Sequence, residues 1–90
     1  MLTIKRFTAT WCGPCKQLTP VFTELQSEMI NEATPVTFQT VDVDQNRDAA
    51  VEANVSSVPT VIFEKDGIPV YRFSGVLPKS VIAGTIRKFL

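Results

Sequence analysis

The chain has 90 residues, 44% of them hydrophobic, and its nine basic and nine acidic residues cancel to a net charge of zero. This length allows one modest core, so we expect residues 1–90 to form a single domain. The balanced charge excludes a broad electrostatic attraction to nucleic acid or anionic lipid. No apolar run approaches the roughly 20 residues that span a bilayer. We therefore expect a cytoplasmic protein that binds neither nucleic acid nor membrane.

The first half of the chain predicts a strand, a long helix and a second strand. Residues 2–8 alternate between apolar and polar side chains, which is typical of a strand. Beyond Cys12, apolar residues recur at helical spacing as far as Met29. Pro20 interrupts that pattern, and there we expect a kink rather than the end of the helix. Residues 35–44, PVTFQTVDVD, favour a second strand, parallel to the first because a helix connects the two.

The second half predicts a short helix, a hairpin and a last helix. Residues 45–54 favour the short helix. Residues 60–64 and 68–73 favour two antiparallel strands, joined by the Asp-Gly pair that tight hairpins prefer. Pro78 can open the last helix, whose apolar face contains Ile82, Ile86 and Phe89. The predicted fold class is α/β, a mixed four-stranded sheet with helices on both faces, in the order β-α-β-α-β-β-α.

Both cysteines lie in the segment FTATWCGPCKQLTP, where Gly13 and Pro14 separate Cys12 from Cys15. The predicted strand ends and the predicted helix begins here, so Cys12 lies at the boundary and Cys15 in the first helical turn. Free backbone N–H groups and the positive end of the helix dipole favour an anion at this position. A thiol placed there ionises more readily and becomes a nucleophile. Trp11 places a flat apolar side chain next to it. The spacing therefore predicts dithiol–disulfide chemistry.

Two other roles for the cysteine pair remain open. A zinc site needs four ligands, but the chain has no other cysteine and no histidine, so such a site would have to be shared between chains. A purely structural disulfide closing so short a loop would constrain the unfolded chain little. We favour the redox interpretation, in which the two sulfurs carry the electrons and neither a metal nor an organic cofactor is bound.

The chain resembles the thioredoxins, and the similarity extends well beyond WCGPCK. It includes VDVDQN at residues 41–46, VPT at residues 58–60, KDG at residues 65–67, and Gly75. The resemblance implies a thioredoxin-like fold and an enzyme that reduces protein disulfides by way of a mixed disulfide. Its expected partners are disulfide-containing proteins and an electron donor of the thioredoxin-reductase type. A binding module without activity, and an oxidase or isomerase with another redox potential, are the alternatives.

The resemblance also implies a role for each residue around the sulfurs. Cys12 attacks the substrate disulfide, and Cys15 then displaces the reduced product. The proline that matches Pro59 is cis in the family, lies beside the two sulfurs, and adjoins backbone that pairs with an extended substrate segment. The residues expected to border this substrate groove are Trp11, Gly13, Pro14, Val58, Pro59 and Gly75.

One departure from the family pattern concerns the sheet. The sequence begins at the strand that leads into the cysteine motif, so the family's first strand and helix have no counterpart in it. The second strand should then be an edge strand, open to pairing with a partner. One face of the sheet should be partly uncovered, and four polar residues of the first two strands suit such a face: Thr3, Lys5, Thr37 and Gln39.

A second departure lies close to the chemistry. The family places a buried Asp six residues before the first cysteine, and that position is Arg6 here. The Lys that normally accompanies this Asp is replaced by Thr40. Asp42, on the same face of the second strand, is the nearest candidate partner for Arg6. We therefore treat Arg6 and Asp42 as possible modulators of the thiol pKa values.

Overall fold

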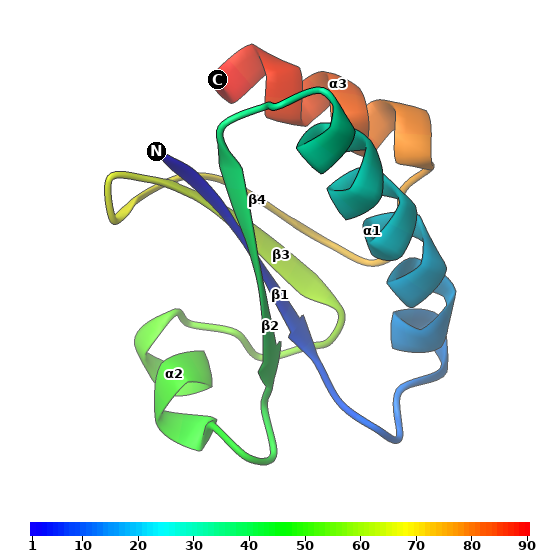
Figure 1. Cartoon of the computed structure of the whole chain (residues 1–90). Helices are drawn as coiled ribbons and strands as arrows, with labels where there is room; N and C mark the ends of the chain where they lie inside the picture. The colour runs from blue at the N-terminus through cyan, green and yellow to red at the C-terminus, as the bar shows by residue number, and fades with distance from the viewer.

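The computed structural model describes all 90 residues and contains the predicted elements in the predicted order (Figure 1). None of the helices has the combination of length and apolar character needed to cross a bilayer. The elements are β1 (Leu2–Thr8), α1 (Gly13–Asn31), β2 (Val36–Asp42), α2 (Arg47–Glu52), β3 (Thr60–Lys65), β4 (Ile68–Ser74) and α3 (Lys79–Phe89).

The four strands form one mixed sheet in the order β2-β1-β3-β4. β1 pairs in parallel with β2 and antiparallel with β3, as predicted. β3 and β4 form the predicted hairpin, with a register shift between Phe63 and Glu64. Asp66 and Gly67 have φ angles of 53° and 83° at its turn, the positive values that the tightest hairpin turns require. The prediction that β2 lies at an edge of the sheet is confirmed.

α1 and α3 pack side by side on one face of the sheet and enclose the main core (Figure 1). α1 runs without a break through Pro20, so the proline does not end the helix. The apolar side chains of α1 and α3 at helical spacing meet the alternate apolar side chains of β1 and β3. The buried members of this core are Leu2, Ile4, Leu18, Phe22, Leu25, Met29, Val61, Phe63, Ile82 and Ile86.

The opposite face of the sheet is covered only in part, by the short helix α2 (Figure 1). A depression of about 730 Å³ lies between α2 and the strands, and Lys5 and Gln39 are among the residues that line it. The Lys5 ammonium is held by the Glu64 carboxylate at 3.1 Å. Polar side chains on this face therefore remain hydrated or paired, which confirms the expectation of a partly uncovered sheet.

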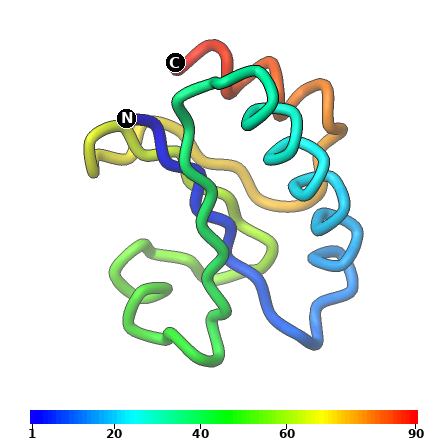
Figure 2. The backbone as a smooth tube through the Cα atoms, viewed as in Figure 1, coloured from blue at the N-terminus to red at the C-terminus, as the bar shows by residue number.

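The turn between α1 and β2, visible in Figure 2 as a sharp reversal of the chain, contains a strained residue. Ala33 has a φ of 56°, and its N–H donates to the carbonyl of Ile30 at 3.0 Å. A side chain at positive φ costs about 1 kcal/mol or more, and helices commonly end on glycine for this reason.

We expect Ala33→Gly to raise the free energy of unfolding by about 1 kcal/mol, measured by urea denaturation. Ala33→Val is the control and should lower it; a Gly variant less stable than the parent would contradict this assignment.

Candidate active site

The N-terminus of α1 holds the two cysteines in the positions that the sequence predicted. Cys12 is the N-cap residue, with φ −88° and ψ 111°, and Pro14 lies in the first turn of the helix. Cys12 and Cys15 are joined in a disulfide. The backbone N–H of Cys15 donates to the Cys12 Sγ at 3.2 Å. One of the helix's free N–H groups thus points at the Cys12 sulfur, where it would stabilise a thiolate in the reduced form.

Both sulfurs lie in a small apolar cluster at the end of the sheet. Cys12 is 4% exposed and Cys15 is 2% exposed, so burial in the disulfide form does not tell the two apart. Ala9 completes the buried cluster, and Val43 and Val58 pack against it. What distinguishes Cys12 is its place at the N-cap, outside the first helical turn.

Three of the residues expected to border a substrate groove, Val58, Pro59 and Gly75, lie together at the start of β3. The Val58–Pro59 peptide bond is cis, as the resemblance implied. The N–H of Gly75 donates to the carbonyl of Pro59 at 2.9 Å, which places the two residues side by side. Gly75 has a φ of 89°, a conformation that glycine adopts without strain. Gly13 is exposed, with open space where a side chain would stand.

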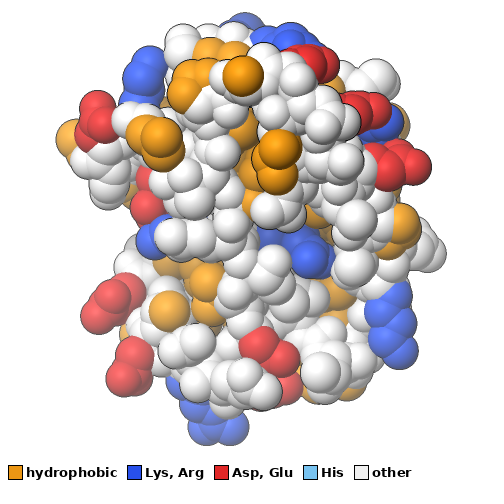
Figure 3. All heavy atoms as spheres, in the orientation of Figure 1, with side chains coloured by type: hydrophobic (Ala, Val, Ile, Leu, Met, Phe, Trp, Pro, Cys, Tyr) orange, Lys and Arg blue, Asp and Glu red, His pale blue; other side chains and the backbone are white.

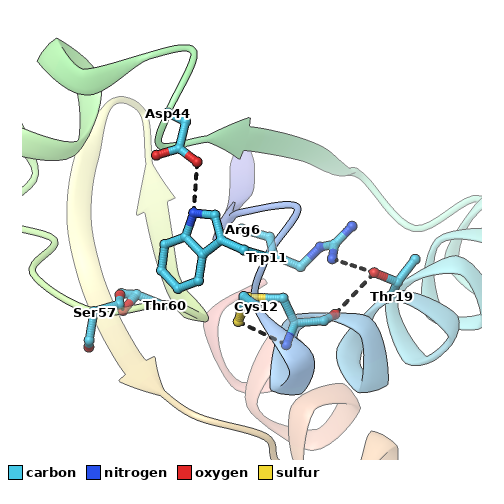
Figure 4. Close-up of a disulfide and its surroundings, with 8 residues drawn as sticks. Arg6, Trp11, Cys12, Thr19, Asp44, Ser57 and Thr60 are labelled. Atoms are coloured by element: carbon cyan, nitrogen blue, oxygen red, sulfur yellow. Dashed lines mark hydrogen bonds between the residues drawn. A yellow bond between two sulfur atoms is a disulfide. The ribbon is translucent and has the colours of Figure 1, made fainter.

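Thr60, which sequence reasoning did not single out, closes the loop that carries Val58 and Pro59. Its hydroxyl donates to the carbonyl of Ser57, its neighbour in Figure 4, at 2.7 Å. The same hydroxyl lies 3.1 Å from the Ser74 hydroxyl. These bonds tie the loop before β3 to the end of β4. The backbone beside Pro59 is therefore tied to the end of β4, and Val58 packs against the cysteine cluster.

Trp11, directly before Cys12 in the chain, is held by Asp44. Trp11 is 68% exposed, and its indole N–H donates to the Asp44 Oδ2 at 2.8 Å (Figure 4). An exposed tryptophan would otherwise sample several rotamers, so this hydrogen bond orients it. Asp44 was not among the predicted site residues, although it lies in the VDVDQN segment that carries part of the thioredoxin resemblance.

Asp42 is not the partner of Arg6, so that expectation was wrong. The Asp42 Oδ1 accepts hydrogen bonds from the backbone N–H groups of Asp44 and Gln45, at 2.8 Å and 3.3 Å. This local turn satisfies the carboxylate with amides only two and three residues further along. Asp42 thus shapes the loop that presents Asp44, and it also lines a small depression beside Cys15.

Arg6 reaches α1 instead. Its guanidinium donates to the Thr19 Oγ1 at 3.0 Å and to the Thr40 Oγ1 at 3.4 Å, and it lies 5.4 Å from the centre of the Phe22 ring. The Thr19 hydroxyl in turn donates to the carbonyl of Cys15 at 3.1 Å (Figure 4). Partial burial lowers the pKa of Arg6 from its ordinary value. The guanidinium is thus linked to the cysteine turn through one hydroxyl, without touching either sulfur.

Comparisons with known proteins agree with this geometry. The family model described as Thioredoxin matches residues 2–88. The chain belongs to the thioredoxin family. It is 43% identical to the thioredoxin of Staphylococcus saprophyticus over 84 residues, which cover 93% of this chain and 78% of that protein. A Staphylococcus aureus thioredoxin is 42% identical over the same shares of the two chains.

Two solved structures extend the comparison to the fold. The Fasciola hepatica thioredoxin superposes with a TM-score of 0.85 at 40% identity, covering 97% of this chain and 79% of that one. A structure described for the thiol-resolving mechanism of a yeast mitochondrial 1-Cys peroxiredoxin via glutathione/thioredoxin systems has a TM-score of 0.84 at 31% identity. It covers 97% of this chain and 77% of its own. Like other thioredoxins, this protein is a thiol–disulfide oxidoreductase with Cys12–Cys15 as its redox pair.

Proposed function

We propose that residues 1–90 act as one domain that reduces protein disulfides, with Cys12 as nucleophile and Cys15 as resolving thiol. The Cys12 thiolate attacks one sulfur of the substrate disulfide; a mixed disulfide forms, and the other substrate sulfur leaves as a thiolate that takes up a proton. The Cys15 thiolate, having lost its proton, then attacks the Cys12 sulfur. The second substrate thiol is released. The protein has then lost two electrons to the substrate and is left with the Cys12–Cys15 disulfide.

The observation that carries these roles is the hydrogen bond from the Cys15 N–H to the Cys12 Sγ at 3.2 Å. A donor aimed at one sulfur stabilises that sulfur as an anion, either as attacking thiolate or as leaving group. Cys15, inside the first turn, stays within reach of Cys12 while Cys12 is bonded to a substrate. The geometry therefore supports attack by Cys12 and resolution by Cys15.

For the substrate site, we propose that an extended segment lies against Val58, Pro59 and Gly75, with Trp11 on its other side. The bonds of Thr60 hold this backbone rigid, and a preorganised strand end accepts a peptide through main-chain hydrogen bonds. Gly13 and Pro14 leave the approach to Cys12 open, because neither has a bulky side chain that would obstruct a substrate. Trp11 contributes apolar contact area in the orientation set by Asp44.

The expected partners follow from the same chemistry. Each turnover leaves the protein oxidised, so a reductase of the thioredoxin-reductase type must return two electrons to the pair. The description of the yeast neighbour, which concerns thiol resolution in a peroxiredoxin, supports a protein disulfide as substrate. We place the activity in the cytoplasm, where a reducing environment keeps such a pair supplied with electrons.

Reduction of insulin by dithiothreitol, followed by the turbidity of the precipitating insulin chain, tests the proposal. A catalytic amount of this protein should shorten the lag before precipitation, and serum albumin at the same concentration should not. A lag that does not change would refute the proposed activity. A second reaction that replaces dithiothreitol by NADPH and a bacterial thioredoxin reductase tests the proposed electron donor separately.

The position of Arg6 leads to a prediction about the thiol pKa values and the reduction potential of the Cys12–Cys15 pair. A fixed cation near the cysteine turn favours thiolate over thiol and so stabilises the reduced form. Arg6→Asp removes that cation and adds a negative charge, which should raise the pKa of at least one thiol and make the pair a stronger reductant. The pH dependence of thiol alkylation and the equilibrium with glutathione measure both effects.

Thr40→Val serves as the matched control for Arg6, because it removes one hydrogen-bond acceptor of the guanidinium and keeps the charge. The potential of Thr40→Val should stay close to that of the parent. If Arg6→Asp also leaves the potential and the alkylation profile unchanged, the guanidinium only packs against Phe22 and α1.

A further inference from the structure

Along residues 36–41, the edge formed by β2 has none of the features that usually prevent one sheet from pairing with another. Natural edge strands are protected by charges, prolines, bulges or short length. β2 pairs with β1 in unbroken register over seven residues, and its segment VTFQTV contains no charge and no proline. In Figure 3, white atoms of backbone and polar side chains dominate the middle of the view, where Figure 1 places β2, with some hydrophobic and basic atoms beside them.

The backbone groups that β2 leaves free can be identified. The N–H of Val43 donates to the carbonyl of Thr8 at 2.9 Å, so Val43 points toward β1. Successive residues of a strand direct their N–H and C=O to opposite edges. Phe38 and Thr40 therefore direct both groups outward, while Gln39 and Val41 are bonded to β1. An unprotected pair of residues with free donors and acceptors stands at the middle of this edge.

The other edge of the sheet, β4, is protected in the usual ways. It contains Pro69 and charged Arg72 and is joined to β3 with a register shift. The Arg72 guanidinium donates to the carbonyls of Ala53 and Asn54 at 3.0 Å and 3.2 Å, which ties this strand to the end of α2. Only β2 is regular throughout, and its residues 36–41 carry no charge.

We propose that β2 pairs antiparallel with β2 of a second copy of this chain, which joins the two sheets into one of eight strands. A twofold axis at Gln39 makes the strand complementary to itself. Phe38 and Thr40 of one copy then face Thr40 and Phe38 of the other and exchange their free N–H···O bonds. Asp42 lies opposite Val36, so the two Asp42 carboxylates stand at opposite ends of the paired strands, and the zero net charge of the chain adds no long-range repulsion.

The arrangement is compatible with the redox site. The sulfur cluster lies beyond the carboxyl end of β2, where Val43 contacts it. An antiparallel pair places the two copies' sulfurs at opposite ends of the joined sheet. Gln39 is exposed on the partly uncovered face, and about 5 Å separates its Cβ from that of its symmetry mate in such a pair. Charged residues introduced at position 39 would therefore face each other in the dimer, which allows the pairing to be tested.

Sedimentation equilibrium of the disulfide form, in which no thiol is free to crosslink, measures the association from micromolar to millimolar concentrations. We expect a reversible dimer of the parent chain. Gln39→Lys and Gln39→Glu should each weaken it about tenfold, because like charges face each other across the axis. An equimolar mixture of the two variants should recover the dimer. Ser80→Lys and Ser80→Glu, which make the same changes at an exposed position of α3, should associate like the parent.

Hydrogen exchange supplies an independent measurement. The N–H groups of Phe38 and Thr40 should become protected as concentration rises, whereas those of Gln39 and Val41, bonded to β1, should be protected throughout. A chain that stays monomeric at millimolar concentration would overturn the proposal. A dimer that both Gln39 variants leave intact would overturn it as well, because association would then use another surface.

Discussion

Cys12→Ser is expected to abolish the reduction of protein disulfides, with turnover reduced to the background rate of dithiothreitol alone. The serine hydroxyl keeps the size of the side chain and its place at the N-cap, yet it does not ionise near neutral pH and is no thiol–disulfide nucleophile. Because serine is a favourable N-cap residue, the variant should remain folded. Loss of activity in this variant therefore reports on the chemistry, provided that its circular dichroism matches that of the parent.

Cys15→Ser should behave differently, and the contrast assigns the two roles. The Cys12 thiolate is still present and can attack once, but nothing resolves the resulting mixed disulfide. The variant should accumulate as a covalent adduct with disulfide-containing proteins, seen as a mass increase that dithiothreitol reverses. If the Cys12 variant forms such an adduct and the Cys15 variant does not, the nucleophile and the resolving thiol are exchanged.

Phe63→Ala should cause the largest loss of stability that the fold predicts for one side chain. Phe63 is fully buried at the centre of the sheet. Its ring packs edge-on against those of Tyr71 and Phe89, with centroids 5.4 Å and 6.1 Å away. Truncating a buried phenylalanine costs about 3–5 kcal/mol, in lost transfer free energy and in the cavity that remains. A domain of this size has roughly 5–15 kcal/mol of stability in total.

Urea denaturation followed by circular dichroism measures this loss as a fall in the unfolding midpoint at constant slope. Val51→Ala is the control, because Val51 is 74% exposed on α2 and its truncation should change stability by no more than about 0.5 kcal/mol. A Phe63 variant whose midpoint moves no further than that of the control would show that the core around β3 and α3 is packed differently.

The elements were predictable because their signals are local. β1 alternates, α1 and α3 repeat their apolar residues every three or four positions, and the Asp66-Gly67 pair marks the hairpin turn. The cysteine pair was predictable for the same reason, since the sulfurs, the helix start and the two residues between them all lie within one short segment. Each of these patterns can be read from residues close together in the sequence, without knowledge of any tertiary contact.

The contacts around the site were less predictable because they join distant segments. The acceptors of Arg6 lie 13 and 34 residues away in the sequence, on α1 and β2, and no periodicity links them. Asp42 shares a strand face with Thr40, which made it a reasonable partner for Arg6. The prediction failed because two backbone amides of the next turn lie closer to its carboxylate than any guanidinium does.

Asp44 and Thr60 were missed for a related reason. Asp44 accepts one hydrogen bond from Trp11, and Thr60 donates one to the carbonyl of Ser57. The positions of both partners are set by loops rather than by a helix or strand. An aspartate after a strand and a threonine after a proline are common residues in such places. Only the folded loop shows that one orients Trp11 and the other fixes the backbone beside Pro59.

The most direct test of the redox assignment is the electron balance of one turnover. Reduced protein is mixed with a slight excess of a disulfide-containing protein, quenched with acid, alkylated, and analysed by mass spectrometry. The mechanism predicts that two alkylatable thiols disappear from this chain for each substrate disulfide reduced, with Cys12 and Cys15 recovered as one intramolecular disulfide. Thiols that stay reduced while the substrate disulfide persists, or a stable adduct formed by the parent chain, would contradict a Cys12–Cys15 couple that completes the reaction.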